Sequence, residues 1–237
     1  MSDNARRDAA IFEWERRKCA PDWDTSSVEE KLAAFVYFNS KYGHIKHPSK
    51  GKIPFELREA QIETVRSWLG NRYSIVLKAR QIGFSTLVSN YCFWLTFFYP
   101  DRHVIMLSRT EREASKLLSH AKYSYGFLPQ WLKLLGPELG WTQKGCAMTN
   151  NSSLESMPSA NDPARGSTAH TVVVDEIAFL PNSDEAWASI EPVADIGGNV
   201  IMLSTANGEG NLFHTLWVGS QTKTGTGSQF VGIFFPW

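Results

Sequence analysis

One stretch of the sequence, VLKARQIGFSTLV, contains residues that bind phosphate groups, but in an unusual order. A phosphate-binding loop usually follows G-x-x-x-x-G-K-[ST], in which backbone amides surround the phosphates and the lysine neutralises them. Over residues 78–85, Gly83 and Ser85 fit this pattern, whereas Lys78 replaces the first glycine and Phe84 replaces the lysine. By itself the match is poor, because a G-x-S sequence after an apolar run is common. The long side chain of Lys78 can still reach phosphates from the entrance of the loop.

Two adjacent acids end a strongly apolar run further along the chain. The sequence TVVVDE places Asp175 and Glu176 at the end of an expected buried strand. An aspartate is also ordinary where a strand runs into a helix cap. Downstream of a phosphate loop, however, the pair matches the Walker B arrangement, in which the first acid holds Mg²⁺ and the second activates water. We therefore expect Ser85 and Asp175 at a magnesium ion and Glu176 beside the attacking water.

A third motif, VIMLSTANGEG, combines an expected strand with a glycine-containing loop. Its candidate functional residues are the polar Ser204, Thr205 and Asn207 and the glycine Gly208. They are consistent with an ordinary turn between a strand and a helix. Beside a nucleotide site, the same residues could instead detect the γ-phosphate and transmit its loss to a moving element.

The pattern around these motifs alternates between apolar strands and helices. Amphipathic helices are expected over 54–69 and 110–127 and a buried helix over 85–99, and two short paired strands are expected across the Asn150-Asn151 turn. This order predicts an α/β fold, a mainly parallel central sheet flanked by helices on both faces. Ligands bind such sheets beyond the carboxyl ends of the strands. Five further apolar strands are expected within 73–78, 103–108, 170–180, 199–205 and 229–235.

The residues before this pattern differ from it. Helices with charged outer faces are expected over 3–19 and 27–41, and 41–54 is rich in Gly, Pro and Lys. We therefore divide the chain into an N-terminal helical extension with a connector, 1–53, and a phosphate-loop ATPase domain, 54–237.

Composition excludes several classes of protein. The 237 residues carry no net charge, which gives no indication of a nucleic-acid partner, although a local basic groove can lie on a neutral protein. Three cysteines without C-x-x-C spacing argue against a disulfide framework and a zinc site. The most apolar run, 91–100, is too short to cross a bilayer, so no membrane association is expected.

The motifs KARQIGFST, VVVDEIAFLP and LSTANG, in this order, resemble those of the large terminase subunits of tailed bacteriophages. Members of that family are ATP-driven motors that package double-stranded DNA into procapsids. The resemblance covers about 54–237 and implies a phosphate-loop NTPase fold of the ASCE type. Some members carry the functional lysine at the start of the loop, as Lys78 does here. The third motif usually reads S-T-P-x-G, and Ala206 replaces its proline.

The resemblance also implies roles for individual residues. Glu176, Lys78 and Arg80 would act in catalysis, and Lys78 and Arg80 are alternatives for the main phosphate cation. Arg165, in an R-G pair ahead of the acidic strand, would complete a neighbouring subunit's site. Gln61 would recognise adenine, with Phe55 and Arg58 nearby. The expected nucleotide-binding residues are Phe55, Arg58, Gln61, Lys78, Ala79, Arg80, Gln81, Ile82, Gly83, Phe84, Ser85 and Thr86.

The implied cofactors are ATP, as substrate, and Mg²⁺. The implied partners are double-stranded DNA, further copies of the chain in a ring on the portal protein, and a small terminase subunit, in the cytoplasm of an infected bacterium. Scattered cations are enough to bind a DNA backbone, and Arg109, Arg112, Lys116 and Lys122 are candidates. They equally fit a solvated helix face.

Full-length members of the family join the motor to a nuclease, whose two metals need clustered carboxylates. No Asp or Glu follows Glu209, so we expect the ATPase domain alone and no nuclease activity. Two alternatives stay open. One is a helicase-like DNA translocase of another kind, and the other is a nucleotide-binding assembly module that docks on a portal without hydrolysis.

Overall fold

The computed structural model describes residues 3–47, 49–159, 169–195 and 197–236. Its helices are α1 (Asp3–Cys19), α2 (Val28–Tyr42), α3 (Glu59–Gly70), α4 (Phe84–Phe98), α5 (Glu111–Gly126), α6 (Gln130–Leu135), α7 (Ser183–Asp195) and α8 (Leu212–Thr222), with a short 3₁₀ turn η2 (Ile177–Phe179). Its strands are β1 (His44–His47), β2 (Gly51–Pro54), β3 (Tyr73–Lys78), β4 (His103–Ser108), β5 (Leu139–Trp141), β6 (Gly145–Met148), β7 (Ser153–Pro158), β8 (Thr171–Asp175), β9 (Asn199–Ser204) and β10 (Val231–Phe235).

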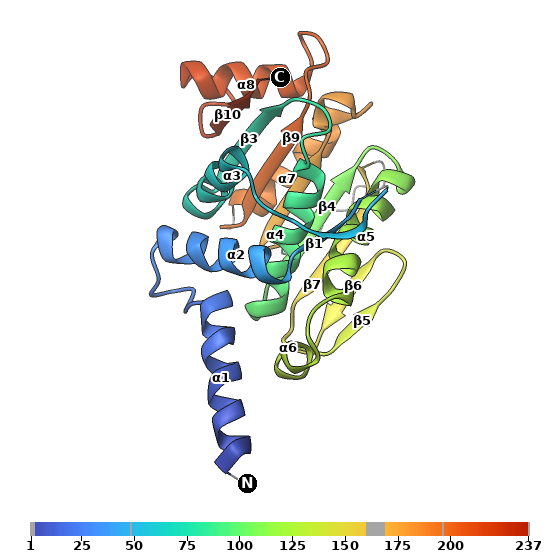
Figure 1. The fold of residues 1–237 in the computed structure, drawn as a ribbon. Coiled ribbons are helices and arrows are strands. Elements are labelled where there is room, and N and C mark those ends of the chain that lie inside the picture. Colours follow the sequence, from blue (N-terminus) through green and yellow to red (C-terminus); the bar gives the residue numbers. More distant parts are fainter. Residues whose placement is uncertain (1–2, 48, 160–168, 196, 237) are drawn as a thin grey trace.

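A single large sheet runs through the described structure in the order β10-β3-β9-β8-β4-β7-β6-β5 (Figure 1). The strands from β10 to β7 pair in parallel. The last two, β6 and β5, are antiparallel. This topology confirms the mainly parallel sheet, and β6 and β7 are the short strands predicted to pair across Asn150-Asn151.

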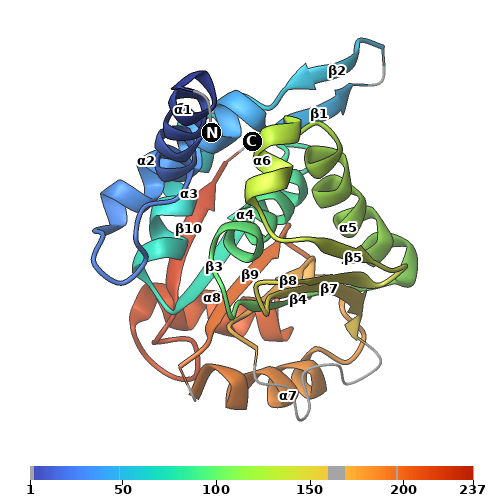
Figure 2. The ribbon, with the colours of Figure 1, turned by 90° about the horizontal axis from the view of Figure 1, so that it is seen from below.

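Helices cover both faces of the sheet, and the alternation of side chains along each strand explains why. Val173 of β8 belongs to the core under α2, α3, α4 and α5. Its neighbours Val172 and Val174 belong to a second core, formed with α7 and α8. Figure 2 shows α7 on the opposite side of the sheet from α4 and α5. Strands that are apolar on both faces are therefore buried on both faces.

The N-terminal segment is only partly separate from this body. Helix α2 begins with a capping box between Ser27 and Glu30, and it buries Phe35 and Phe38 in the core beneath the sheet. Helix α1 extends away from the body (Figure 1), and its Phe12 stacks on Trp131 at 5.0 Å. These two helices match the predicted ones. The segment interpreted as a connector forms the hairpin β1–β2.

The order of the strands gathers polar residues at one edge of the sheet. Strands β3, β9, β8 and β4 are consecutive neighbours and all run in the same direction. Their last residues are Lys78, Ser204, Asp175 and Ser108, which therefore lie along the same carboxyl edge. Among the described helices, none combines the length and the apolarity needed to cross a bilayer.

Candidate nucleotide-binding site

The loop after β3 ends in a backbone conformation that favours glycine. Gly83 precedes α4 with φ 81° and ψ 12°, and Gln81 also has a positive φ, 62°. A Cβ atom on Gly83 would lie 3.2 Å from Gln61 Nε2, so the position is restricted by space as well as by conformation. The amides that open α4 have no partners within the helix and attract an anion.

Phe84 stands where the usual lysine would be, and it is a core residue. Its side chain is buried and packs against Phe235 of β10, with ring centroids 5.3 Å apart. This position therefore contributes apolar packing and no positive charge.

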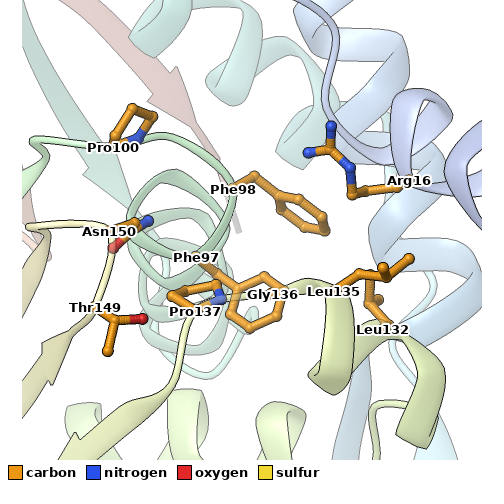
Figure 3. Close-up of a pocket in the computed structure, with 10 residues that line it drawn as sticks. All are labelled: Arg16, Phe97, Phe98, Pro100, Leu132, Leu135, Gly136, Pro137, Thr149 and Asn150. Atoms are coloured by element: carbon orange, nitrogen blue, oxygen red, sulfur yellow. The ribbon is translucent and has the colours of Figure 1, made fainter.

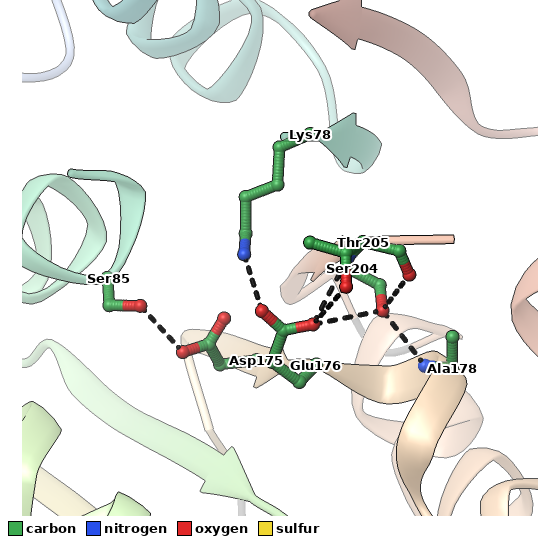
Figure 4. Close-up of polar contacts among 7 residues, drawn as sticks. All are labelled: Lys78, Ser85, Asp175, Glu176, Ala178, Ser204 and Thr205. Atoms are coloured by element: carbon green, nitrogen blue, oxygen red, sulfur yellow. Dashed lines mark hydrogen bonds and ion pairs between the residues drawn. The ribbon is translucent and has the colours of Figure 1, made fainter. Parts of the chain in front are cut away.

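Lys78, the predicted phosphate cation, is paired with Glu176 directly after the acidic strand. Its Nζ donates to Glu176 Oε1 at 2.7 Å, and its side chain is 6% exposed (Figure 4). The other carboxylate oxygen, Oε2, accepts from Thr205 N at 3.1 Å and from Thr205 Oγ1 at 3.3 Å. Glu176 itself has φ 56° and ψ 42°, a left-handed conformation that is uncommon for a non-glycine residue. Such strain is concentrated at functional sites and costs of order 1–3 kcal/mol.

The pKa values of Glu176 and Asp175 are shifted in opposite directions. Burial acts to raise the pKa of Glu176, but the charge and hydrogen bond of Lys78 and the bonds from Thr205 outweigh it, so this pKa is lowered. Burial raises the pKa of Asp175, and the charge of Glu176 adds to the effect, while Lys78 and Ser85 oppose it. Glu176 is thus an anion at neutral pH, and Asp175 is a carboxyl group that a cation would help to ionise.

The surroundings of Asp175 fit a magnesium ion. Its Oδ2 accepts from Ser85 Oγ at 3.0 Å (Figure 4), and its Oδ1 is buried without a hydrogen-bond partner. Carboxylate and hydroxyl oxygens are the ligands that Mg²⁺ prefers. Within the described residues, no three His, Cys, Asp or Glu side chains are placed to hold a metal. A cation at Asp175 would therefore take its remaining ligands from water and from phosphate oxygens, as Mg²⁺ usually does when it binds with a nucleotide.

The third motif is hydrogen-bonded to the turn that follows the acidic strand. Ser204 Oγ accepts from Ala178 N at 3.2 Å and lies 3.4 Å from Glu176 Oε2. Asn207 Nδ2 donates to Ala178 O at 2.8 Å. Gly208 has φ 73° and is exposed at the turn that follows. The end of β9 is thus hydrogen-bonded to Glu176 and to the turn that follows it, and the coupling role of these residues stays a prediction.

A cavity of about 580 Å³ joins these groups. All nine loop residues from 78 to 86 line it, and Glu176, Phe179 and Thr205 lie across from them. The structure therefore brings together the loop, the catalytic candidate and part of the third motif.

Of the three residues predicted to recognise adenine, Gln61 contacts the loop, and none of the three lines this cavity. Gln61 is buried, its Oε1 accepts from Arg58 N at 3.0 Å, and its Nε2 donates to Ile82 O at 3.0 Å. Phe55 is also buried, and a Cβ on Gly83 would lie 4.0 Å from its ring. In this structure Gln61 braces the loop, and its adenine role stays a prediction.

The basic residues proposed for DNA separate into two groups. Arg109 and Lys116 line the 580 Å³ cavity. Arg112 is exposed, and Lys122 Nζ donates to Thr142 O at 3.0 Å, in the turn between β5 and β6. Their contact with DNA stays a prediction. Arg165, predicted to act on a neighbouring subunit, lies outside the described residues.

Five residues that line the site were not predicted from the sequence, namely Ser108, Glu113, Leu117, His120 and Phe179. One signal for Ser108 was present, since it ends an apolar strand as Asp175 does. Glu113 lies on the first turn of the helix that follows. Its place could not be derived without knowing that β4 lies beside β8.

A second cavity, of about 350 Å³, lies away from the loop between α4, α6 and α1 (Figure 3). Phe97, Phe98 and Leu132 contribute apolar walls, and Arg16 is the one charged side chain among its ten described lining residues. It offers no acid–base pair for catalysis.

Comparisons with known proteins point to one family. Residues 75–230 match the family model described as terminase large subunit, T4likevirus-type, N-terminal. The large terminase ATPase domain of Thermus phage P74-26 is 18% identical, with a TM-score of 0.61, and the match covers 76% of this chain and 81% of that one. The bacteriophage HK97 large terminase is 13% identical, with a TM-score of 0.67 over 84% of this chain and 43% of that one. The large terminase of a thermophilic bacteriophage, in complex with ADP, is 12% identical, with a TM-score of 0.54 over 76% of this chain and 45% of that one. This likeness confirms the expected phosphate-loop ATPase fold.

Proposed function

The chain belongs to the family of terminase large subunits of the T4likevirus type, of which it carries the N-terminal part, and we propose that it is the Mg²⁺-dependent ATPase of a motor that moves double-stranded DNA into a procapsid. It spans 43% of the HK97 large terminase, so the activities of a whole terminase are part of the proposal. The matched structures support nucleotide binding, because one of them was solved with ADP and another with ATP-γ-S.

The observation that carries the proposal is the pairing of Lys78 with Glu176 at the mouth of the loop, 2.7 Å apart. When a triphosphate enters, its negative charge competes with Glu176 for the Lys78 ammonium group. Lys78 would then stabilise charge on the transferring group, and Arg80 lines the same cavity as a second cation. Glu176, released at Oε1 and still held at Oε2 by Thr205, would orient or deprotonate the attacking water.

Ser85 and Asp175 are the residues that would hold Mg²⁺, which neutralises phosphate charge when it is bound. Ser85 opens α4 next to the phosphate-binding amides, and Asp175 ends the neighbouring acidic strand. Thr205 and Ser204, bonded to the Glu176–Ala178 turn, would pass the loss of the γ-phosphate to β9 and the loop that follows.

The remaining roles come from the family. Arg165 would enter the site of a neighbouring copy in a ring, so the isolated chain would be a slow ATPase. The ring would form on the portal protein, with the small terminase subunit as a further partner, in the cytoplasm of the infected bacterium. No nuclease activity is expected from these residues.

Phosphate release from ATP tests the proposal when it is measured with Mg²⁺, with EDTA, and with linear or forked duplex DNA. We expect Mg²⁺-dependent turnover that intact linear duplex stimulates, with no strand separation on the fork. Strand separation would favour a helicase-like translocase. Nucleotide binding without turnover would favour the assembly module.

A further inference from the structure

The junction between β4 and α5 forms an additional wall of the nucleotide site. Ser108, at the end of β4, and Glu113, Lys116 and His120, on α5, line a cavity of about 180 Å³. The same cavity is bordered by Asp175 and by its neighbours Ser85 and Glu176. Glu113, Lys116 and His120 also line the larger cavity around the loop, so the two spaces adjoin. Helix α5 therefore faces the nucleotide site with its first three turns.

Three oxygen atoms at this wall lack hydrogen-bond partners. They are Ser108 Oγ, Glu113 Oε2 and Asp175 Oδ1, and each is withdrawn from solvent in the described structure. Ser108 is 2% exposed and Asp175 is 8% exposed. A buried polar atom without a partner costs about 1–3 kcal/mol, so three such atoms around one cavity indicate a bound group. That group must offer donors, because carboxylate oxygens only accept.

The partnerless acceptor oxygens favour a hydrated cation over an anion, although Lys116 lines the same cavity as a further positive charge. Lys78 neutralises Glu176 at 2.7 Å, and Arg109 neutralises Glu113 through its other oxygen, Oε1, at 2.8 Å. Asp175 has no cation partner among the described ion pairs, and its hydrogen bond comes from a neutral serine. Water molecules held by a divalent cation are strong donors, and Mg²⁺ keeps several of them when it binds with a nucleotide.

We propose that Glu113 and Ser108 hold the water molecules around the cation of the bound nucleotide. This inference rests on the proposed function. Glu113 is a positioning residue in this arrangement. Its Oε2 accepts from the water shell beside Asp175, and its Oε1 keeps Arg109 at the phosphate side of the cavity. Arg109 and Lys116 then belong to the ATP site, whereas the sequence analysis named them as candidates for binding DNA.

Mn²⁺ provides a direct probe, because its binding is measurable by electron paramagnetic resonance without any turnover. We expect Glu113→Gln to weaken Mn²⁺ binding to the protein–ADP complex by about 10- to 100-fold, as is usual when a group that supports a metal's ligands is lost. Binding of ADP in EDTA should stay within about twofold of wild type. Ser108→Ala, which removes a hydroxyl without adding volume, should weaken Mn²⁺ binding in the same direction.

Glu111→Gln is the matched control, since Glu111 is exposed on the same turn of α5 and lines neither cavity. It should leave Mn²⁺ binding unchanged. Equal Mn²⁺ affinity in wild type and Glu113→Gln would overturn the inference. So would an equal loss of ADP affinity in EDTA, because that would reveal a purely structural role. If wild type binds neither ADP nor Mn²⁺ with ADP, the proposed ATPase function fails instead.

Discussion

Lys78 neutralises Glu176 and also faces the cavity where phosphates would bind. Arg80 also lines that cavity, but its side chain is exposed and its guanidinium lies 6.0 Å from the Phe179 ring. The buried lysine is therefore the better candidate for the main phosphate cation. The loop has a core phenylalanine at the usual lysine position and a buried lysine at its entrance.

We predict that Lys78→Ala lowers ATP turnover by about 10²- to 10³-fold, the usual effect of removing one donor that stabilises transition-state charge. Arg80→Ala should retain much of the wild-type rate. Phosphate release under saturating ATP measures both. The reverse order would assign the phosphate charge to Arg80.

Loss of Lys78 also leaves Glu176 without its cation, so a folding defect must be distinguished from a catalytic one. Breaking a fully buried pair costs about 3–5 kcal/mol, and the cost here is smaller because Glu176 is one-third exposed. The double variant Lys78→Ala/Glu176→Gln removes the uncompensated charge. Its thermal midpoint should recover relative to Lys78→Ala, while turnover stays lost.

At the scale of elements, the connection from β3 to α4 depends on one glycine. Gly83 has a positive φ, and Gln61, which braces the loop through Ile82 O, leaves little room for a side chain there. The loop is thus shaped by α3 from outside as well as by its own sequence.

We predict that Gly83→Ala weakens nucleotide binding markedly, because alanine in a left-handed conformation costs roughly 1–2 kcal/mol and displaces the Gln61 amide. Gly126→Ala, at the end of α5, is the control, since a Cβ there meets nothing within 4 Å and φ is not positive. Titration with a fluorescent ATP analogue compares the two. Unchanged affinity in Gly83→Ala would show that the loop can change its backbone freely.

The sequence predicted these elements well where a pattern was local. Alternating apolar strands and helices gave β3, β4, β9 and β10, and the three motifs lie at the ends of neighbouring strands. The strand expected over 170–180 ends at Asp175, because Glu176 takes a left-handed conformation and η2 follows, and the helix expected over 54–69 begins only at Glu59. What it could not predict was the neighbour of each strand. Only the order β9-β8-β4 brings Ser108 and Glu113 to Asp175. The hairpin β1–β2 was also missed, because its Gly, Pro and Lys content is typical of a connector.

At the scale of the whole molecule, the N-terminal helices share the core of the sheet domain. Phe35 of α2 is fully buried and packs edge-on against Tyr91 and Trp94 of α4. Trp94 Nε1 donates to Cys19 O at 2.7 Å, which ties the end of α1 to the same helix. Because α4 begins at the phosphate loop, α2 supports the helix that carries the site. The boundary at residue 53 stays a prediction.

We predict that Phe35→Ala destabilises the whole chain by about 3–5 kcal/mol, the usual cost of removing a buried phenylalanine. Ile11→Ala, on the exposed face of α1, should change stability by less than about 0.5 kcal/mol. Urea unfolding followed by tryptophan fluorescence should show one transition for each variant. Two transitions, with the nucleotide site retained after the first, would show that α2 unfolds independently of the site.

The most direct measurement is steady-state and single-turnover hydrolysis of ATP by Glu176→Gln, together with its affinity for ATP and Mg²⁺. A lost general base lowers the rate by about 10²- to 10⁴-fold, and we predict a loss in that range with nucleotide binding retained. Glu185→Gln, an exposed acid on the first turn of α7, should hydrolyse ATP as wild type does. Wild-type turnover by Glu176→Gln would contradict the assignment of this site as the ATPase centre.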